Sequence, residues 1–307
     1  MKFTFETEVS VRPPYRLDLT VEALRRLAAN VVDIVDDRGV YRRALSDARG
    51  AGLVEVTQPS PRSIRIRVAG REGARWVPAV ERMLGLHTQL DEWYERVRPF
   101  PWLATLTREL KGLRPPVYPA LWEALAHAIV FQQISIHAAA SIMRRTIQAL
   151  SEPLEHEGGL YYPFMSPHAL LAAREEQLRG AGLSGNKVAH LRSAAVAVLD
   201  EMVTEEQVEL LPSVQAAQRL TTVRGIGAWS AAVVLLRGFG RLDVFPMKDS
   251  GVARTIKLLS GDLEIDTHAL LEALGPVRGM LYFHLLLGRL SALNNDAARR
   301  RLPDRPR

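Results

Sequence analysis

Two glycines flank one aliphatic residue at Gly225-Ile226-Gly227, between a segment of helical composition at 213–220 and an apolar run at 230–236. The interval is too short for anything but a tight turn between two helices. Glycine tolerates positive φ, so the backbone can turn here with its N–H groups facing outward. Such groups beside a helix N-terminus form an anion site that suits a phosphate. Ile226 is expected to fill the space beneath the turn.

Asp249 is a second residue whose position suggests chemistry. It lies in the segment DVFPMKDSGVAR, about twenty residues after the turn and directly before a stretch with a helical pattern. Taken alone, an aspartate before a helix is explained by N-capping, because its side chain accepts hydrogen bonds from the first N–H groups. The same helix N-terminus would favour an ionised carboxylate, so a cap and a reactive group are compatible.

Two polar elements accompany the helical segments. The segment FQQIS (131–135) ends an apolar helical run. Its two glutamines and serine are poorly explained by core packing, and the alternative is a polar helix end that faces solvent. The segment GLSGNK (182–187) precedes a long helical pattern. There, Lys187 is expected either to meet a phosphate or to lie solvated at the start of the helix.

The pattern V-x-G-I-G-x-W-S-A, with an acid followed by V-x-R (Val252 and Arg254), resembles the helix-hairpin-helix superfamily of DNA glycosylases. The FQQIS and GLSGNK segments resemble the same superfamily. The similarity is specific over 185–260 and 119–135 and looser elsewhere. It is nearest to the 3-methyladenine DNA glycosylase II (AlkA-like) branch.

The resemblance implies a base-excision repair enzyme that extrudes an alkylated base from the duplex and hydrolyses its bond to the sugar. Asp249 would be the catalytic carboxylate, which stabilises the developing cation and orients or deprotonates the attacking water. The remaining implied contacts are with DNA. They involve the hairpin residues Gly225, Ile226 and Gly227, the phosphate-binding Lys187, and Gln132 and Gln133 in the gap left by the extruded base.

An alkylated base often carries a positive charge and favours an aromatic face, a contact worth on the order of 0.5–2 kcal/mol. Trp229, directly after the hairpin, is the candidate for that face, although a tryptophan that packs in the core is the alternative. Val233 and Leu286 stand where the resemblance implies further rings. We therefore expect Phe245 and Tyr282 to supply other pocket walls.

Trp229 also bears on the type of reaction. Family members that cleave the strand carry a lysine at this position, which attacks the sugar. Tryptophan cannot, so base release without a lyase step is expected unless Lys248 substitutes. The resemblance further implies that hairpin carbonyls near Val223 and Gly225 offer a site for Na⁺ or K⁺. No side-chain metal site and no other cofactor are expected.

Two other functions stay open. A non-catalytic DNA-binding protein would keep the helix-hairpin-helix but would need neither Asp249 nor an aromatic pocket. A glycosylase for oxidised purines would share the fold and the acid. The sequence favours the alkylated-base glycosylase over both.

Composition agrees with a nucleic-acid partner. The 307 residues carry a formal net charge of +6 and contain no cysteine. The absence of cysteine excludes disulfides, thiol catalysis and a cysteine-ligated iron–sulfur cluster. No run of about eighteen apolar residues occurs. We expect a monomeric, cytoplasmic, nucleoid-associated protein that binds damaged double-stranded DNA and no membrane.

The elements that must position these residues indicate an α+β fold. Short strands at 40–44, 52–57 and 63–68 are predicted with a helix at 19–35, in a small antiparallel-sheet domain over 1–72. A mostly α-helical, two-lobed helix-hairpin-helix body follows. One lobe, 118–240, carries the hairpin. The other lobe combines 73–117 with 241–307 and carries Asp249.

Overall fold

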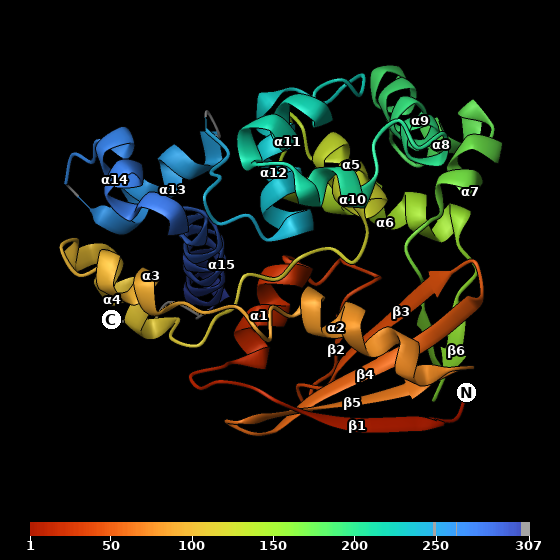
Figure 1. Cartoon of the computed structure of the whole chain (residues 1–307), viewed down its shortest axis with the longest axis horizontal. Coiled ribbons are helices and arrows are strands. Elements are labelled where there is room, and N and C mark those ends of the chain that lie inside the picture. Colours follow the sequence, from red (N-terminus) through yellow and green to blue (C-terminus); the bar gives the residue numbers. More distant parts are fainter. Residues whose placement is uncertain (248–249, 262, 302–307) are drawn as a thin grey trace.

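The computed structural model describes residues 1–247, 250–261 and 263–301 of the chain (Figure 1). Its fold is α+β: an antiparallel sheet is followed by a mainly helical body, as predicted. Asp249, the predicted catalytic residue, lies outside the described residues.

The sheet has five antiparallel strands in the order β1-β5-β4-β3-β2. They are β1 (Phe5–Ser10), β2 (Ile34–Val35), β3 (Tyr41–Asp47), β4 (Gly50–Ser60) and β5 (Ser63–Ala69). Along β5, Ile64, Ile66 and Val68 are fully buried, whereas Arg65 and Arg67 are partly exposed and form ion pairs with Glu6 of β1. This alternation is what a strand with one buried face requires.

Helix α1 (Leu17–Arg25) packs beside the sheet and is shorter than the predicted helix at 19–35. It ends because Arg26 takes a positive φ of 64° and Asn30 begins a turn. The Asn30 side chain accepts hydrogen bonds from the N–H groups of Val32 and Asp33. Asparagine favours such turns because its side chain competes with the helical hydrogen bonds. The apolar spacing beyond Arg26 therefore belongs to a turn and the edge strand β2.

A first helical lobe follows the sheet. It contains α5 (Leu121–Val130), α6 (Ile136–Leu150), α7 (Pro167–Ala172), α8 (Glu175–Gly180), α9 (Gly185–Leu199), α10 (Glu205–Leu210), α11 (Ser213–Leu220) and α12 (Ala228–Phe239). A short hairpin of β6 (Leu154–His156) and β7 (Gly159–Tyr161) projects from it toward the sheet. The lobe shares one hydrophobic core with the sheet, η1 (Gly73–Trp76) and α2 (Val77–Met83).

The second lobe joins two distant stretches of the chain. Its helices are α3 (Asp91–Arg96), α4 (Pro101–Glu109), α13 (Ser250–Ser260), α14 (Thr267–Leu274), η2 (Gly275–Val277) and α15 (Gly279–Arg301). They build a separate core, at the left of Figure 1, that includes the fully buried Trp93 and Phe283. Helix α1 lies between the lobes and contacts α15.

A buried charge cluster connects the sheet to α5. The guanidinium of Arg43 on β3 donates to Asp33 Oδ1 at 2.7 Å and to Glu123 Oε1 at 2.7 Å. All three side chains are nearly inaccessible to solvent. Because removing one partner would leave a charge buried and unpaired, the cluster holds α5 in one position on the sheet.

No single helix among the described residues is long and apolar enough to cross a membrane. The segments Thr267–Val277 and Gly279–Ser291 meet that test only when taken together, and they are bent by 114° with respect to each other.

Candidate active site

A cavity of about 850 Å³ opens between the two lobes. Its walls come from the turn between α5 and α6, the first turns of α12 and α13, the middle of α15, and Arg26 at the end of α1. The volume lies within the range of small-molecule pockets, roughly 300–1,000 Å³. Segments that are far apart in the sequence therefore meet at one cavity.

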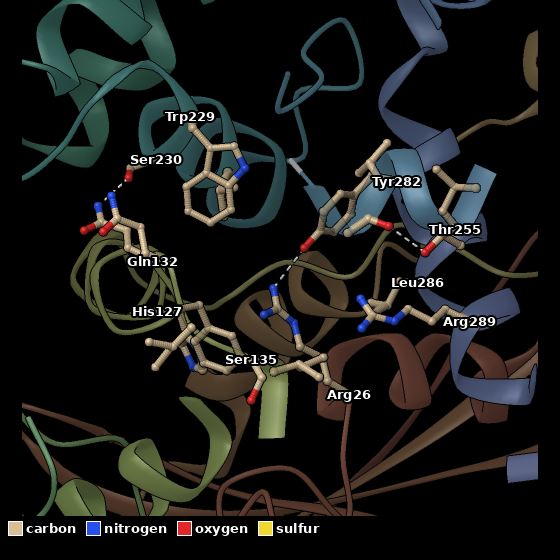
Figure 2. Close-up of a pocket in the computed structure, with 18 of the residues that line it drawn as sticks. Arg26, His127, Gln132, Ser135, Trp229, Ser230, Thr255, Tyr282, Leu286 and Arg289 are labelled. Atoms are coloured by element: carbon tan, nitrogen blue, oxygen red, sulfur yellow. Dashed lines mark hydrogen bonds between the residues drawn. The ribbon is translucent and has the colours of Figure 1, made fainter. Parts of the chain in front are cut away.

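Two aromatic side chains face this cavity from opposite lobes. Figure 2 shows Trp229 of α12 on one wall and Tyr282 of α15 on the other. Val233 and Leu286 line the cavity as well, so the two positions without rings do lie at the site. The structure thus brings together two of the three predicted pocket aromatics.

The prediction that Phe245 forms a pocket wall is wrong. Its ring is only 7% exposed and belongs to the core of the second lobe, and Phe245 is absent from the cavity lining. The residue lies where the chain enters that lobe after α12. The ring of Phe245 packs in the core of this lobe, because its burial removes apolar surface from water.

The chain that follows Asp249 reaches the same cavity. Gly251, Val252, Arg254 and Thr255 of α13 all line it, and the Thr255 hydroxyl donates to the Gly251 carbonyl at 2.7 Å. The V-x-R pair predicted from the sequence is therefore at the site. The role of Asp249 itself stays a prediction.

The hairpin between α11 and α12 is built differently at its two glycines. Gly225 has a φ of +92°, and a Cβ atom there would come within 2.4 Å of the His190 ring. Gly227 has an extended φ of −93°, and a Cβ atom there would meet nothing within 4 Å. Ile226 is buried beneath the turn, as expected from its type. Only Gly225 needs a glycine for folding, and Gly227 is the open N-cap of α12.

The two glutamines of the FQQIS segment have different surroundings. Gln132 Nε2 donates to the Gly225 carbonyl at 2.9 Å and to Ser230 Oγ at 2.7 Å, so its side chain is engaged inside the protein (Figure 2). Gln133 is exposed at the cavity edge and has a φ of +57°. Of the two residues expected to enter DNA, the geometry favours Gln133.

Lys187 is not directed to solvent. Its Nζ donates to the carbonyls of Ile129, Val130 and Gln132 at 2.8, 2.8 and 3.0 Å. An ammonium group has three N–H donors, so these carbonyls at the end of α5 use all of them. Burial lowers the pKa of Lys187 to about 8. The arrangement favours a C-capping role over the expected phosphate contact.

Arg26 is one of the cavity residues that the sequence did not reveal. It lies on the sheet side of the molecule, and its Nη2 donates to Tyr282 Oη at 3.3 Å across the cavity (Figure 2). Its guanidinium carbon is 4.8 Å from the centre of the Phe131 ring. Because the apolar pattern predicted helix through this position, nothing in the sequence marked Arg26 as the end of α1.

His127 also lines the cavity, although its side chain is largely buried. Its ring stacks on that of Tyr118, with centroids 4.2 Å apart. Burial and the nearby charges of Arg26, Arg237 and Arg43 keep the pKa of His127 well below its ordinary value. The imidazole is therefore neutral near pH 7. Among the described residues, no group of three or more histidines or acids could hold a metal ion.

Comparison with known proteins supports the same fold. The family described as HhH-GPD superfamily base excision DNA repair protein matches residues 126–276, and the AlkA N-terminal domain matches residues 6–119. The chain is 26% identical to the DNA-3-methyladenine glycosylase of Bacillus subtilis over 221 residues, which cover 70% of this chain and 73% of that protein.

Two solved structures are similar over nearly the whole chain. The 3-methyladenine DNA glycosylase from Archaeoglobus fulgidus has a TM-score of 0.78 at 26% identity, covering 94% of this chain and 99% of that one. The 8-oxoguanine glycosylase/lyase of Clostridium acetobutylicum, solved with double-stranded DNA, has a TM-score of 0.73 at 17% identity, covering 96% and 100%. The second likeness is one of fold. Together, these matches show that the chain carries an AlkA N-terminal domain followed by a domain of the HhH-GPD superfamily of base excision DNA repair proteins.

Proposed function

We propose that this protein is a DNA glycosylase that releases alkylated bases from double-stranded DNA. The observation that carries the proposal is the cavity between Trp229 and Tyr282, which opens beside the exposed N-cap of α12. The named activities of the Bacillus and Archaeoglobus relatives are consistent with this assignment. An aromatic cavity alone fits many ligands. A cavity beside a phosphate-binding helix start fits a base that is still attached to its strand.

In this proposal the hairpin binds the DNA backbone through main-chain N–H groups at the start of α12. Extruding a base costs roughly a few kcal/mol, and damage lowers that cost. Gln133, exposed at the cavity edge, would occupy the space that the base leaves. The base would then lie between Trp229 and Tyr282.

Bond cleavage would rely on the carboxylate of Asp249. As the bond from sugar to base breaks, positive charge develops on the sugar, and a fixed carboxylate stabilises it. The same group would orient or deprotonate the attacking water. In this proposal the placement of the next residues, Gly251 and Val252, along the cavity is consistent with such a role.

We further propose that the reaction stops at base release. A lyase step needs an amine that attacks the sugar, and the described lining of the cavity contains no lysine. Lys187 is engaged by the carbonyls at the end of α5. The products would be a free base and an intact strand with an abasic sugar.

A monovalent cation at the hairpin remains part of the proposal. The Val223 carbonyl accepts from the Ile226 N–H at 3.0 Å, and the Gly225 carbonyl accepts from Gln132. Each carbonyl oxygen has two lone pairs, so both can also face a Na⁺ or K⁺ ion. Such an ion would hold the turn and add positive charge near the phosphate.

We propose that the enzyme acts as a monomer on DNA in the cytoplasm.

The test is a single-turnover excision assay on duplexes that carry one methylated, deaminated or oxidised base. Asp249→Asn should lower release of alkylated bases more than tenfold, which corresponds to about 1.4 kcal/mol of lost transition-state stabilisation. Binding to undamaged duplex should change little, because only one charge that faces the sugar is removed.

Asp266→Asn is the matched control. Asp266 caps α14 by accepting hydrogen bonds from the N–H groups of His268 and Ala269, and it does not line the cavity. Asparagine caps a helix as well as aspartate does. This variant should keep full activity. Asp249→Asn with more than about a tenth of the wild-type rate would refute the catalytic assignment. Binding without release of any base would favour the non-catalytic DNA-binding alternative. Release of oxidised purines alone would favour the oxidised-purine glycosylase.

A further inference from the structure

The start of α9 supports the two turns that the proposed function assigns to DNA. Lys187, in its first turn, binds the end of α5, from which the chain continues to Gln133. His190, one turn later, lies beneath the hairpin, where a Cβ atom on Gly225 would come within 2.4 Å of its ring. Helices α5 and α9 also pack against each other. One helix therefore holds both turns with respect to the body of the protein.

The contacts of Lys187 fix the main chain at the end of α5. Its Nζ donates to the carbonyls of Ile129 and Val130 at 2.8 Å and to that of Gln132 at 3.0 Å. The last carbonyls of a helix have no partner within the helix, and a cation stabilises that end. Because Ile129 and Val130 are fully buried, their carbonyls would be costly to leave unpaired. The ammonium group therefore holds the chain before and after Phe131.

The residue that follows has a strained main chain. Gln133 has a φ of +57°, in the left-handed region that residues with a side chain rarely adopt. Such a conformation persists only where the surrounding structure holds it, and it is common at functional sites. Gln132, directly before it, is held by its carbonyl through Lys187 and by its side chain through Gly225 and Ser230 (Figure 2). The strain at Gln133 is thus maintained from the neighbouring residue.

We propose that Lys187 is a positioning residue for base extrusion. By binding the carbonyls at the end of α5, it keeps the next turn in the conformation that exposes Gln133 at the cavity edge. Because this conformation exists before DNA binds, the turn needs little reordering when Gln133 enters the duplex. The inference rests on the proposed glycosylase function. It gives Lys187 a part in the reaction that requires no contact with the DNA.

The experiment measures single-turnover release of 7-methylguanine, corrected for spontaneous loss, from two duplexes. The lesion is paired with cytosine in one duplex and lies opposite an abasic site in the other, where no pair has to be broken. Lys187→Met keeps an unbranched side chain but removes the charge and the donors. Release from the paired lesion should fall about tenfold, as expected when a buried acceptor loses its partner. Release opposite the abasic site should fall by less than about threefold, because extrusion is easier there.

Lys111→Met is the matched control. Lys111 follows α4, its side chain is exposed, and it does not line the cavity. The substitution removes the same charge from the protein. Both release rates and the affinity for undamaged duplex should stay unchanged.

A double-mutant cycle tests whether Lys187 acts through Gln133. Gln133→Ala removes the side chain that the turn presents, so it should also slow release from the paired lesion. Since both changes would impair the same step, the double variant should be no slower than the slower single variant. A residue that only stabilises the fold would instead lower the rate by the same factor with either residue at position 133.

Three results would overturn the proposal: an unchanged rate on the paired lesion in Lys187→Met, equal losses on both duplexes, or multiplied losses in the double variant. Weaker binding to undamaged duplex, with a salt slope reduced by about 1, would overturn it in favour of a phosphate contact. Thermal melting shows whether Lys187→Met is folded. If it is not, Lys187→Gln, which keeps two N–H donors without the charge, is measured in its place and must meet the same criteria. Wild-type protein that releases neither 7-methylguanine nor 3-methyladenine would refute the proposed function itself, which is a different outcome.

Discussion

The side-chain amide of Gln132 donates a 2.9 Å hydrogen bond to the main-chain carbonyl of Gly225, 93 positions further along the chain. The same nitrogen donates to Ser230 Oγ at 2.7 Å, next to Trp229. A polar residue at the end of α5 thus fixes the hairpin and the aromatic wall with respect to each other. DNA held by the hairpin would therefore be held in register with the cavity.

Replacing Gln132 should lower both the affinity for duplex DNA and the rate of base release. Gln132→Leu removes two hydrogen bonds and leaves a partly buried carbonyl without its side-chain partner, a cost of about 1–3 kcal/mol. Affinity for undamaged duplex and the rate of base release should both fall, by roughly five- to a hundredfold. Gln133→Ala provides the control, because its exposed side chain makes no such contact with the hairpin. It should keep duplex affinity and lower release only from paired lesions. An unchanged affinity in Gln132→Leu would contradict this role.

The two hairpin glycines should respond in opposite ways. Gly225→Ala places a Cβ atom against the His190 ring and an alanine at φ +92°, so the free energy of unfolding should fall by more than about 1 kcal/mol. Gly227→Ala adds a methyl group in open space at a permitted φ and should remain folded, with an intact melting curve.

Gly227→Ala should nevertheless weaken binding to damaged and undamaged duplex alike, because the methyl group stands where a phosphate approaches the start of α12. Fluorescence anisotropy over a range of salt concentrations measures this effect. Wild-type affinity should decrease as salt increases, since counterions are released on binding. A variant that alters only lesion preference would place the turn in the base pocket instead.

Trp229 should favour the release of cationic bases. Trp229→Leu keeps the wall apolar but removes the aromatic face, which attracts a cation by about 0.5–2 kcal/mol. Release of 3-methyladenine should then fall more than release of hypoxanthine, by up to about thirtyfold. Val233 and Leu286, which also line the cavity, carry no ring, so the ring of Tyr282 on the opposite wall would be left to face the base. Equal losses for both bases would mean that Trp229 only packs against the core.

Stability should decrease as the pH falls below neutrality, in part through His284. This residue is buried in α15 beside Trp93, and burial lowers its pKa to about 4. Its folded-state pKa lies below the unfolded value of about 6.5, so the unfolded chain binds the proton first. The contribution of His284 is therefore present above pH 6.5 and is lost as the pH falls toward 4. The loss should reach about 2 kcal/mol at pH 5.

Urea unfolding at pH 7 and pH 5 measures this loss. His284→Leu should show a smaller decrease between the two pH values than wild type, since leucine has no proton to bind. His127, buried and held neutral in the same way, should remain as a second source of acid sensitivity. Identical decreases in both proteins would show that His284 titrates normally in the folded state.

Local features of this protein followed from the sequence. The period of two at Ile64, Ile66 and Val68 predicted β5, because side chains of a strand alternate between faces whatever the rest of the chain does. The spacing of Gly225 and Gly227 predicted the hairpin, since a turn depends on the residues within it. Trp229 follows directly after that turn, and the resemblance together with the chemistry of a cationic base made it the candidate for the pocket face that the structure places at the cavity.

Local sequence pattern did not predict the structure of segments whose conformation depends on residues far away in the sequence. The apolar spacing continued past Arg26, but Asn30 turns the chain, and Arg237 of α12 binds the end of α1. Phe245 was expected at the pocket by its type, but the second lobe buried it. The resemblance implies DNA contacts for Lys187 and Gln132, and only the structure shows the hydrogen bonds that these two side chains make within the protein.

The sequence alone thus indicated the family and the α+β architecture, through motifs that resemble known glycosylases, and it predicted the hairpin from short-range spacing. Only the tertiary structure decided which charges meet at the cavity. Arg26 and Tyr282 are 256 positions apart and yet share a hydrogen bond at its floor. Such a contact depends on how α1 is placed between two lobes. That placement results from the packing of many side chains together, and no stretch of sequence encodes it by its own pattern.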